Sequence, residues 1–178
     1  IEPSENTAAA AKQKGIESIV DFFGTRLALD LVSNGIKADL LLGNNVIAHV
    51  PEINDFVAGL KILLSEKGII TFEFPHLLQL IDKNQFDTIY HEHYSYLSCK
   101  SVEHLASSYG LTLFDVEAVA AHGGSNRYWI SAKPQDKTQR LRESVQNEGS
   151  IGLSDPDEWA IARQTTDNSI NQLREWLM

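Results

Sequence analysis

The sequence predicts an α/β fold in which a mostly parallel sheet is covered by helices on both faces. Several short apolar runs have the length and the Ile, Val, Leu and Phe content of buried strands. These strand-like runs are 16–21, the first part of 39–50, and 68–75. Segments with helical spacing alternate with them, which is the pattern of strand–helix–strand units. Two further runs, 111–119 and 127–132, flank a turn at 122–126 and predict an antiparallel last strand.

The helices are indicated by their composition and by the residues at their ends. The first is rich in Ala and ends before Gly15, a residue suited to a helix C-cap. The second has apolar residues at helical spacing and stops at Asn34-Gly35. The third is amphipathic and ends before Gly68, and Ser101 is the expected N-cap of the fourth. The expected helices span 7–14, 25–33, 53–65 and 102–109.

The composition changes beyond Pro134. Gln, Arg, Glu and Asp dominate there, and apolar residues such as Leu141 and Val145 recur periodically. This pattern predicts one or two amphipathic helices around a loop at 149–156. We therefore divide the chain into a domain at 1–133 and the start of a C-terminal helical segment at 134–178.

Charge and cysteine content exclude several classes of protein. The formal net charge of −9 argues against nucleic acid as the main partner. No apolar run approaches the roughly 20 residues of a membrane helix, so we expect no membrane partner. Cys99 is the single cysteine, which excludes a disulfide within the chain and a zinc site built from thiolates. We expect Cys99 to be a buried, inert thiol in a protein of the reducing cytoplasm.

The most unusual stretch is 85–98. It contains two histidines, two acids, three tyrosines and two serines. If the chain is extended here, Tyr90 and Glu92 point to one side and His91 and His93 to the other. An imidazole beside a carboxylate and phenols is a common arrangement for proton transfer. The length of the stretch is typical of a lid or binding loop, and a hydrogen-bonded surface loop is the alternative.

Polar residues follow several predicted strands at the point where each one ends. They are Glu2, Asn45 with His49 beyond it, Glu73 with His76 beyond it, and the loop at 90–93. Ligands of parallel sheets bind beyond the carboxyl ends of the strands. We therefore expect these residues to gather at one shared site.

Four motifs together resemble a known family. They are IEPS at 1–4, GNNVIAHVP at 43–51, FDTIYHEHYSY at 86–96, and HGGS at 122–125 followed by Arg127. In this order they resemble the sugar C-methyltransferases that use S-adenosylmethionine on nucleotide-linked deoxysugars. The resemblance covers residues 1–133, and its most specific parts are the Tyr-His-Glu-His and His-Gly-Gly-Ser segments.

The resemblance implies a Rossmann-like class I methyltransferase sheet and methylation of a sugar carbon next to a ketone. It assigns the base that removes the proton from this carbon to His93. Free imidazole has a pKa of about 6.5, which suits this role. Glu92 and Tyr90 would orient the substrate or stabilise charge, and His49 would be a second active-site histidine that donates to the enolate oxygen.

The same resemblance suggests the binding residues. Glu2 would accept the ribose hydroxyls of S-adenosylmethionine, Asn45 would contact cofactor or substrate, and Asp21 would lie beside the adenine. Gly124 and Ser125 would bring backbone amides to a diphosphate, with Arg127 as its cation. An exposed terminal Glu2 and a plain hairpin turn are the alternatives. The other histidines are expected to be structural or at the surface: His76, His91, His104 and His122.

Members of this family have a glycine-rich cofactor loop and a cysteine-rich zinc region upstream of the position of Ile1. We therefore expect the chain to be a fragment that holds no metal itself, binds S-adenosylmethionine weakly, and self-associates through an exposed sheet edge. Two other functions stay open. The chain is either a module that binds nucleotide-sugar or protein without chemistry, or it holds a metal through His91, His93, Glu92 and His49.

Overall fold

The computed structural model describes residues 1–152 and 156–177. Four of its segments form one sheet in the order β1-β2-β4-β3. The strands are β1 (Ala38–Asn44), β2 (Leu64–Pro75), β3 (Thr112–Val119) and β4 (Ser125–Ser131). β1 is parallel to β2, and β4 is antiparallel to both β2 and β3. β1, β2 and β3 therefore run in one direction, and the predicted α/β class with an antiparallel last strand is confirmed.

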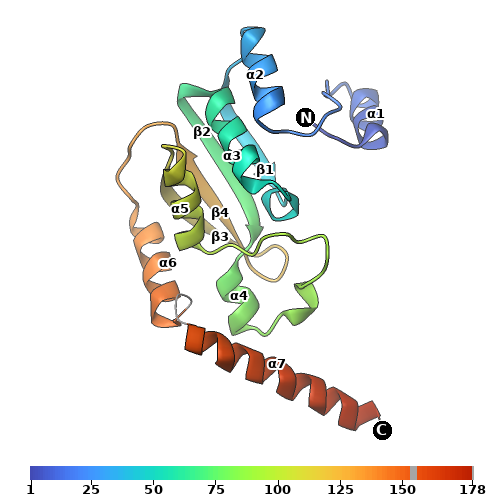
Figure 1. Cartoon of the computed structure of the whole chain (residues 1–178), viewed down its shortest axis with the longest axis vertical. Helices are drawn as coiled ribbons and strands as arrows, with labels where there is room; N and C mark the ends of the chain where they lie inside the picture. The colour runs from blue at the N-terminus through green and yellow to red at the C-terminus, as the bar shows by residue number, and fades with distance from the viewer. Residues whose placement is uncertain (153–155, 178) are drawn as a thin grey trace.

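The helices lie largely where their sequence patterns place them. They are α1 (Glu5–Gln13), α2 (Thr25–Ser33), α3 (Ile53–Leu63), α4 (Leu77–Asp82), α5 (Cys99–Ser108), α6 (Gln139–Ser150) and α7 (Pro156–Leu177), with 3-10 turns at η1 (Ile47–His49) and η2 (Phe86–Thr88). α7 extends away from the sheet (Figure 1). In the described part of the chain, no helix combines the length and the apolarity that a membrane span requires.

The core lies on one face of the sheet. Alternate residues of β2 point to this face, and Ile70, Phe72 and Phe74 are buried there. α3, α5 and α6 cover them (Figure 1). Phe74 stacks on Tyr128 of β4 with ring centroids 4.7 Å apart. Leu141 of α6 is fully buried in the same core, so this helix packs as part of the sheet domain although it lies beyond residue 133.

The opposite face of the sheet differs from the prediction. Leu40 and Leu42 of β1 point to this face and are 53% and 71% exposed. Helices on both faces were expected, but the helices of the described residues cover only one. The strand pattern could not show this, because a run of apolar residues predicts burial without naming the element that buries it.

The predicted strand at 16–21 is wrong. Ile16 and Val20 are 58% and 49% exposed, and the segment has no ladder of strand hydrogen bonds. One backbone bond, from the Glu2 N–H to the Ile19 carbonyl at 2.9 Å, joins it to the beginning of the chain. A strand requires a paired neighbour, and no described segment pairs with this run along its length.

α5 begins earlier than predicted, and Ser98 rather than Ser101 is its N-cap. The Ser101 N–H donates to the Ser98 hydroxyl at 3.2 Å, and the Ser98 N–H donates to the Ser101 hydroxyl at 2.8 Å. The two serines form a capping box in which a hydroxyl replaces the usual Glu or Gln.

Close packing between α3 and the start of α2 gives a test of this arrangement. A Cβ added at Gly59 would lie 2.7 Å from the carbonyl carbon of Gly24. Because this neighbour is backbone, we expect Gly59→Ala to lower the free energy of unfolding by about 1–3 kcal/mol. Gly149 in α6 has no atom within 4 Å of such a Cβ, so Gly149→Ala should stabilise the chain by about 0.5–1 kcal/mol. Urea unfolding measures the stability of both variants. Equal unfolding midpoints for Gly59→Ala and Gly149→Ala would contradict the close packing of α3 against Gly24.

Candidate active site

The site is centred on two imidazoles from segments far apart in the sequence. β1 leads into η1, which ends at His49, and His93 follows η2 in the loop between α4 and α5. The ring centroids of His49 and His93 lie 4.8 Å apart. The Tyr94 N–H donates to the Ala48 carbonyl at 2.8 Å and joins the two segments. The predicted gathering of these histidines is therefore present.

Tyr90 and His93 contact each other directly. The His93 N–H donates to the Tyr90 carbonyl at 3.0 Å, which makes residues 90–93 a turn. The Tyr90 hydroxyl lies 3.0 Å from His93 Nε2, with ring centroids 4.2 Å apart. The extended conformation, in which Tyr90 and His93 point to opposite sides, is wrong, because a local backbone bond closes the turn.

Backbone carbonyls determine which nitrogen of each ring carries hydrogen. His93 Nδ1 lies 3.1 Å from the Thr88 carbonyl, and His49 Nδ1 lies 3.0 Å from the Glu92 carbonyl. A carbonyl only accepts, so both Nδ1 atoms are donors. Neutral His93 therefore has its lone pair on Nε2, where it accepts from the Tyr90 hydroxyl. The side chain of Glu92 is exposed, and the contact of this residue with His49 is through its backbone.

The surroundings of His93 favour its neutral form. Burial of the ring is the largest cause that lowers its pKa below the ordinary 6.5, and the neighbouring His49 lowers it further. The Thr88 carbonyl and the Glu92 carboxylate act in the opposite direction with smaller effect. A lowered pKa keeps His93 unprotonated and available as a base near neutral pH.

Five buried side-chain polar atoms have no hydrogen-bond partner among the described residues, and three of them belong to Tyr96, Asn45 and Glu73. The Tyr96 hydroxyl is buried and unbonded, and the Tyr96 ring meets the His93 ring edge-on at 5.7 Å. Asn45, which follows β1 in the left-handed conformation (φ 51°), has an unbonded buried Oδ1. Glu73 in β2 is 8% exposed and has an unbonded Oε1. Buried polar atoms without partners are rare, so these atoms indicate a place for a ligand.

Tyr96 was not predicted as a site residue, whereas Glu73 was among the polar residues expected near the strand ends. For Glu73 a signal was available. An acid placed between Phe72 and Phe74 in an otherwise apolar strand faces away from the core.

Two of the predicted cofactor residues form separate clusters. Glu2 Oε1 accepts from the Ser4 N–H at 2.8 Å at the start of α1. Asp21 accepts from the Arg26 guanidinium at 2.6 Å, and this hydrogen bond is the main cause that lowers the pKa of Asp21. A hollow of about 830 Å³ lies beside them, between α1 and residues 15–20. Its lining is largely apolar and does not include His93.

The predicted substrate residues lie at the β3–β4 turn. The Gly124 carbonyl accepts from the His76 N–H at 3.1 Å, and Gly124 has φ 126°. The Ser125 hydroxyl is buried and donates to the Ala121 carbonyl at 3.2 Å. The Arg127 guanidinium lies 3.5 Å from Glu117 and is part exposed.

His76 was also expected at the shared site beyond Glu73, but His76 and Cys99 instead lie together against Glu148. Both are buried, and His76 Nε2 lies 2.7 Å from Glu148 Oε1. Burial first, and the Glu148 carboxylate second, raise the pKa of the Cys99 thiol to about 12. Of the proposed metal ligands His91, Glu92, His93 and His49, the two imidazoles of His49 and His93 lie together, but no three of the four form a group in the described part of the chain. The group of metal-ligating side chains found there consists instead of His76, Cys99 and Glu148.

Sequence comparison gives one informative relative. The chain is 33% identical over 156 residues to the C-methyltransferase NovU of Streptomyces niveus, a match that covers 86% of this chain and 37% of that protein. The chain therefore spans little more than a third of the relative's length. No protein-family model matches the chain.

Solved structures agree on the fold. A methyltransferase of Thermotoga maritima that depends on S-adenosylmethionine superposes with a TM-score of 0.56, at 17% identity, over 74% of this chain and 71% of that one. The magnesium protoporphyrin IX methyltransferase of Synechocystis, solved with bound S-adenosylhomocysteine, gives a TM-score of 0.52 at 14% identity, over 72% and 61% of the two chains. The four-stranded sheet and its helices thus have the fold of class I methyltransferases.

Proposed function

The chain is related in sequence to a C-methyltransferase and has the fold of S-adenosylmethionine-dependent methyltransferases, and from this we propose that it catalyses C-methylation of a nucleotide-linked keto-deoxysugar. The observation that carries the proposal is His93. Its Nδ1–H is fixed by a backbone carbonyl, its Nε2 lone pair accepts from the Tyr90 hydroxyl, and its pKa is lowered. These are the properties of a base that removes a proton from a carbon acid.

The unbonded acceptors at the strand ends fit the cofactor. Asn45 follows β1, and Glu73 lies in β2 opposite Asn44, the last residue of β1. The Asn45 N–H donates to the Glu73 carbonyl at 2.6 Å. S-adenosylmethionine carries an ammonium, an amino group and ribose hydroxyls, all of them donors that such acceptors bind. When bound, it supplies a methyl group on a positively charged sulfur. Glu2 and Asp21 remain proposed ligands for its ribose and adenine.

His93 would act first. Its Nε2 takes the proton from the carbon next to the ketone, and the C–H electron pair moves into the enolate. Nδ1–H keeps its hydrogen bond to the Thr88 carbonyl, and this bond stabilises the new positive charge on the ring. The Tyr90 hydroxyl occupies Nε2 in the structure, so it must turn away before the substrate carbon can approach. Once turned, Tyr90 becomes a donor for the substrate.

We assign the complementary role in this step to His49. Its Nδ1 is held by the Glu92 carbonyl, so a proton on His49 Nε2 makes the ring a cation. A cationic His49 would donate to the enolate oxygen, and its charge would keep the adjacent His93 neutral. For the diphosphate of the substrate we propose Arg127 together with the Gly124–Ser125 turn.

Proton exchange tests the proposal without methyl transfer. The protein is incubated in heavy water with a nucleotide-diphosphate-linked 4-keto-6-deoxyhexose, and deuterium at C3 is measured by mass spectrometry. We expect incorporation well above the rate without protein. Binding of the sugar nucleotide with no incorporation would instead support the noncatalytic module. If the protein shows no binding and no incorporation, both functions are contradicted.

The pH dependence of His93 follows from its environment. Because its folded pKa lies below 6.5, His93 stays neutral until the pH falls below that value. We expect the acid limb of proton exchange to have its midpoint below pH 6.5. His49→Asn removes the second cause of the lowered pKa, so the midpoint should move upward. An NMR titration of the His93 imidazole measures the same shift, and a midpoint that stays in place would contradict the electrostatic coupling of the two rings.

A further inference from the structure

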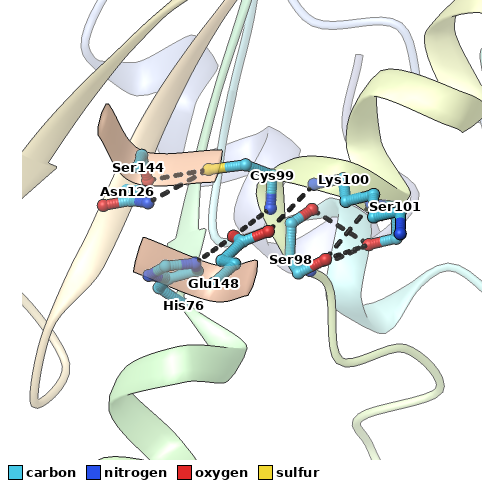
Figure 2. A network of polar contacts seen from close by, with 8 residues as sticks. All are labelled: His76, Ser98, Cys99, Lys100, Ser101, Asn126, Ser144 and Glu148. Atoms are coloured by element: carbon cyan, nitrogen blue, oxygen red, sulfur yellow. Dashed lines mark hydrogen bonds and ion pairs between the residues drawn. The ribbon is translucent and has the colours of Figure 1, made fainter. Parts of the chain in front are cut away.

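A buried carboxylate on α6 joins three segments of the chain. Glu148 is 3% exposed. Its Oε1 lies 2.7 Å from His76 Nε2 and accepts from the Cys99 N–H at 2.5 Å, while its Oε2 accepts from the Lys100 N–H at 3.1 Å. Figure 2 shows the carboxylate between His76 on one side and the first residues of α5 on the other.

The two groups that Glu148 holds lie at opposite ends of one segment. His76 is the residue immediately before α4, and Cys99 is the first residue of α5. Between them runs the segment 77–98, which carries Tyr90 and His93. Its ends are already close, because the Leu77 N–H donates to the Leu97 carbonyl at 3.2 Å.

We infer that Glu148 is a positioning residue that fixes both ends of the 77–98 segment and so holds His93 against His49. An anion at the first amides of α5 is favourable in itself, since these N–H groups have no partner within the helix. The effect on catalysis rests on the proposed function, whereas the effect on the segment does not.

A metal site is the rival interpretation of the same residues. Suitable atoms of His76, Cys99 and Glu148 lie within 4.8 Å of one another. The metal-binding form of cysteine is the thiolate, and burial raises the pKa of Cys99 to about 12. Both oxygens of Glu148 already accept N–H groups. These contacts are more typical of a structural hydrogen-bond network than of a set of metal ligands.

The test compares two substitutions on the same helix. Glu148→Gln replaces one acceptor oxygen by an NH2 donor. It therefore removes at least one of the hydrogen bonds to His76, Cys99 and Lys100. Glu143→Gln is the control, since Glu143 is exposed and, among the described residues, accepts only from Gln139. NMR then follows the His93 imidazole and the amide exchange of Tyr94, whose N–H holds the segment to η1, in the absence of substrate.

We expect Glu148→Gln to raise the pKa of His93 toward 6.5 and to speed exchange of the Tyr94 amide by about tenfold or more, while amides between β2 and β4 keep their protection. Unchanged His93 and Tyr94 signals would overturn the inference. If Glu148→Gln does not fold, His76→Gln replaces it, because that variant frees only one end of the segment and leaves α5 capped. Stoichiometric binding of added zinc chloride with loss of the His76–Glu148 contact would also overturn it, in favour of the metal site.

Activity separates this inference from the proposed function. With methyl transfer measured, Glu148→Gln should lower kcat by about tenfold or more and leave KM for the sugar nucleotide nearly unchanged. If no methyl transfer is found with the unsubstituted protein, the proposed function fails, and the NMR comparison still decides the role of Glu148.

Discussion

Replacing His93 with glutamine is expected to lower the rate of C-methylation by about 10²–10⁴-fold. Glutamine has similar length and can bond to Thr88 and Tyr90, but it cannot hold a proton taken from carbon. The loss should therefore appear in kcat, with little change in substrate binding. Transfer of a labelled methyl group to a nucleotide-linked 4-keto-6-deoxyhexose measures it, together with deuterium exchange at C3.

The neighbouring His91 provides the control. It is exposed and lies in the same turn, so His91→Gln should keep the activity of the unsubstituted protein. Thermal unfolding checks that His93→Gln remains folded. Equal activity of the two variants would transfer the role of base to another residue, and His49 would be the next to test.

Local patterns predicted those elements whose residues alone determine their structure. The helix at 25–33 was predicted with its observed bounds, because its apolar spacing and the Asn34-Gly35 stop are both local signals. The run at 16–21 has equally good strand composition and is not a strand. Pairing is a property of two segments, so composition alone could not decide whether a partner lies beside it.

The site was predictable to the extent that it follows from the sheet. The rule that polar residues meet beyond the carboxyl ends of parallel strands correctly placed His49 beside the loop of His93, although 43 residues separate His49 from Glu92, whose carbonyl it bonds. The turn at 90–93 was missed, because a backbone bond between neighbours overrides the alternation expected of an extended chain.

Glu148 was missed for a different reason. It lies in a segment rich in Gln, Arg and Glu, where an acid is usually part of a solvated helix face. One signal was present, since Glu148 follows Leu141 by two helical turns and therefore lies on the same face. A single charged residue on an apolar stripe indicates a buried partner, but only coordinates can identify the partner as His76 and the start of α5.

The largest effect on stability is expected for Glu148→Ala. This change leaves the Cys99 and Lys100 N–H groups and the His76 ring without their acceptor in a buried place. Breaking such a buried arrangement by removing one partner costs about 3–5 kcal/mol of folding free energy. Glu143→Ala, on the exposed side of α6, should change stability by less than about 0.5 kcal/mol. Urea unfolding at pH 7 measures the difference.

The acid dependence of this difference identifies its cause. Burial alone would raise the pKa of Glu148, but the bonds from His76 and from the Cys99 and Lys100 amides lower it below the ordinary 4.5. A carboxyl with a lowered folded pKa stabilises the protein above its unfolded pKa, and this stabilisation is lost as the pH falls through the folded value. The gap between the unsubstituted protein and Glu148→Ala should therefore shrink below pH 4.5. A gap that stays constant into acid would mean that Glu148 stabilises the fold by packing and volume, and its charge would then have no part in holding the segment that carries His93.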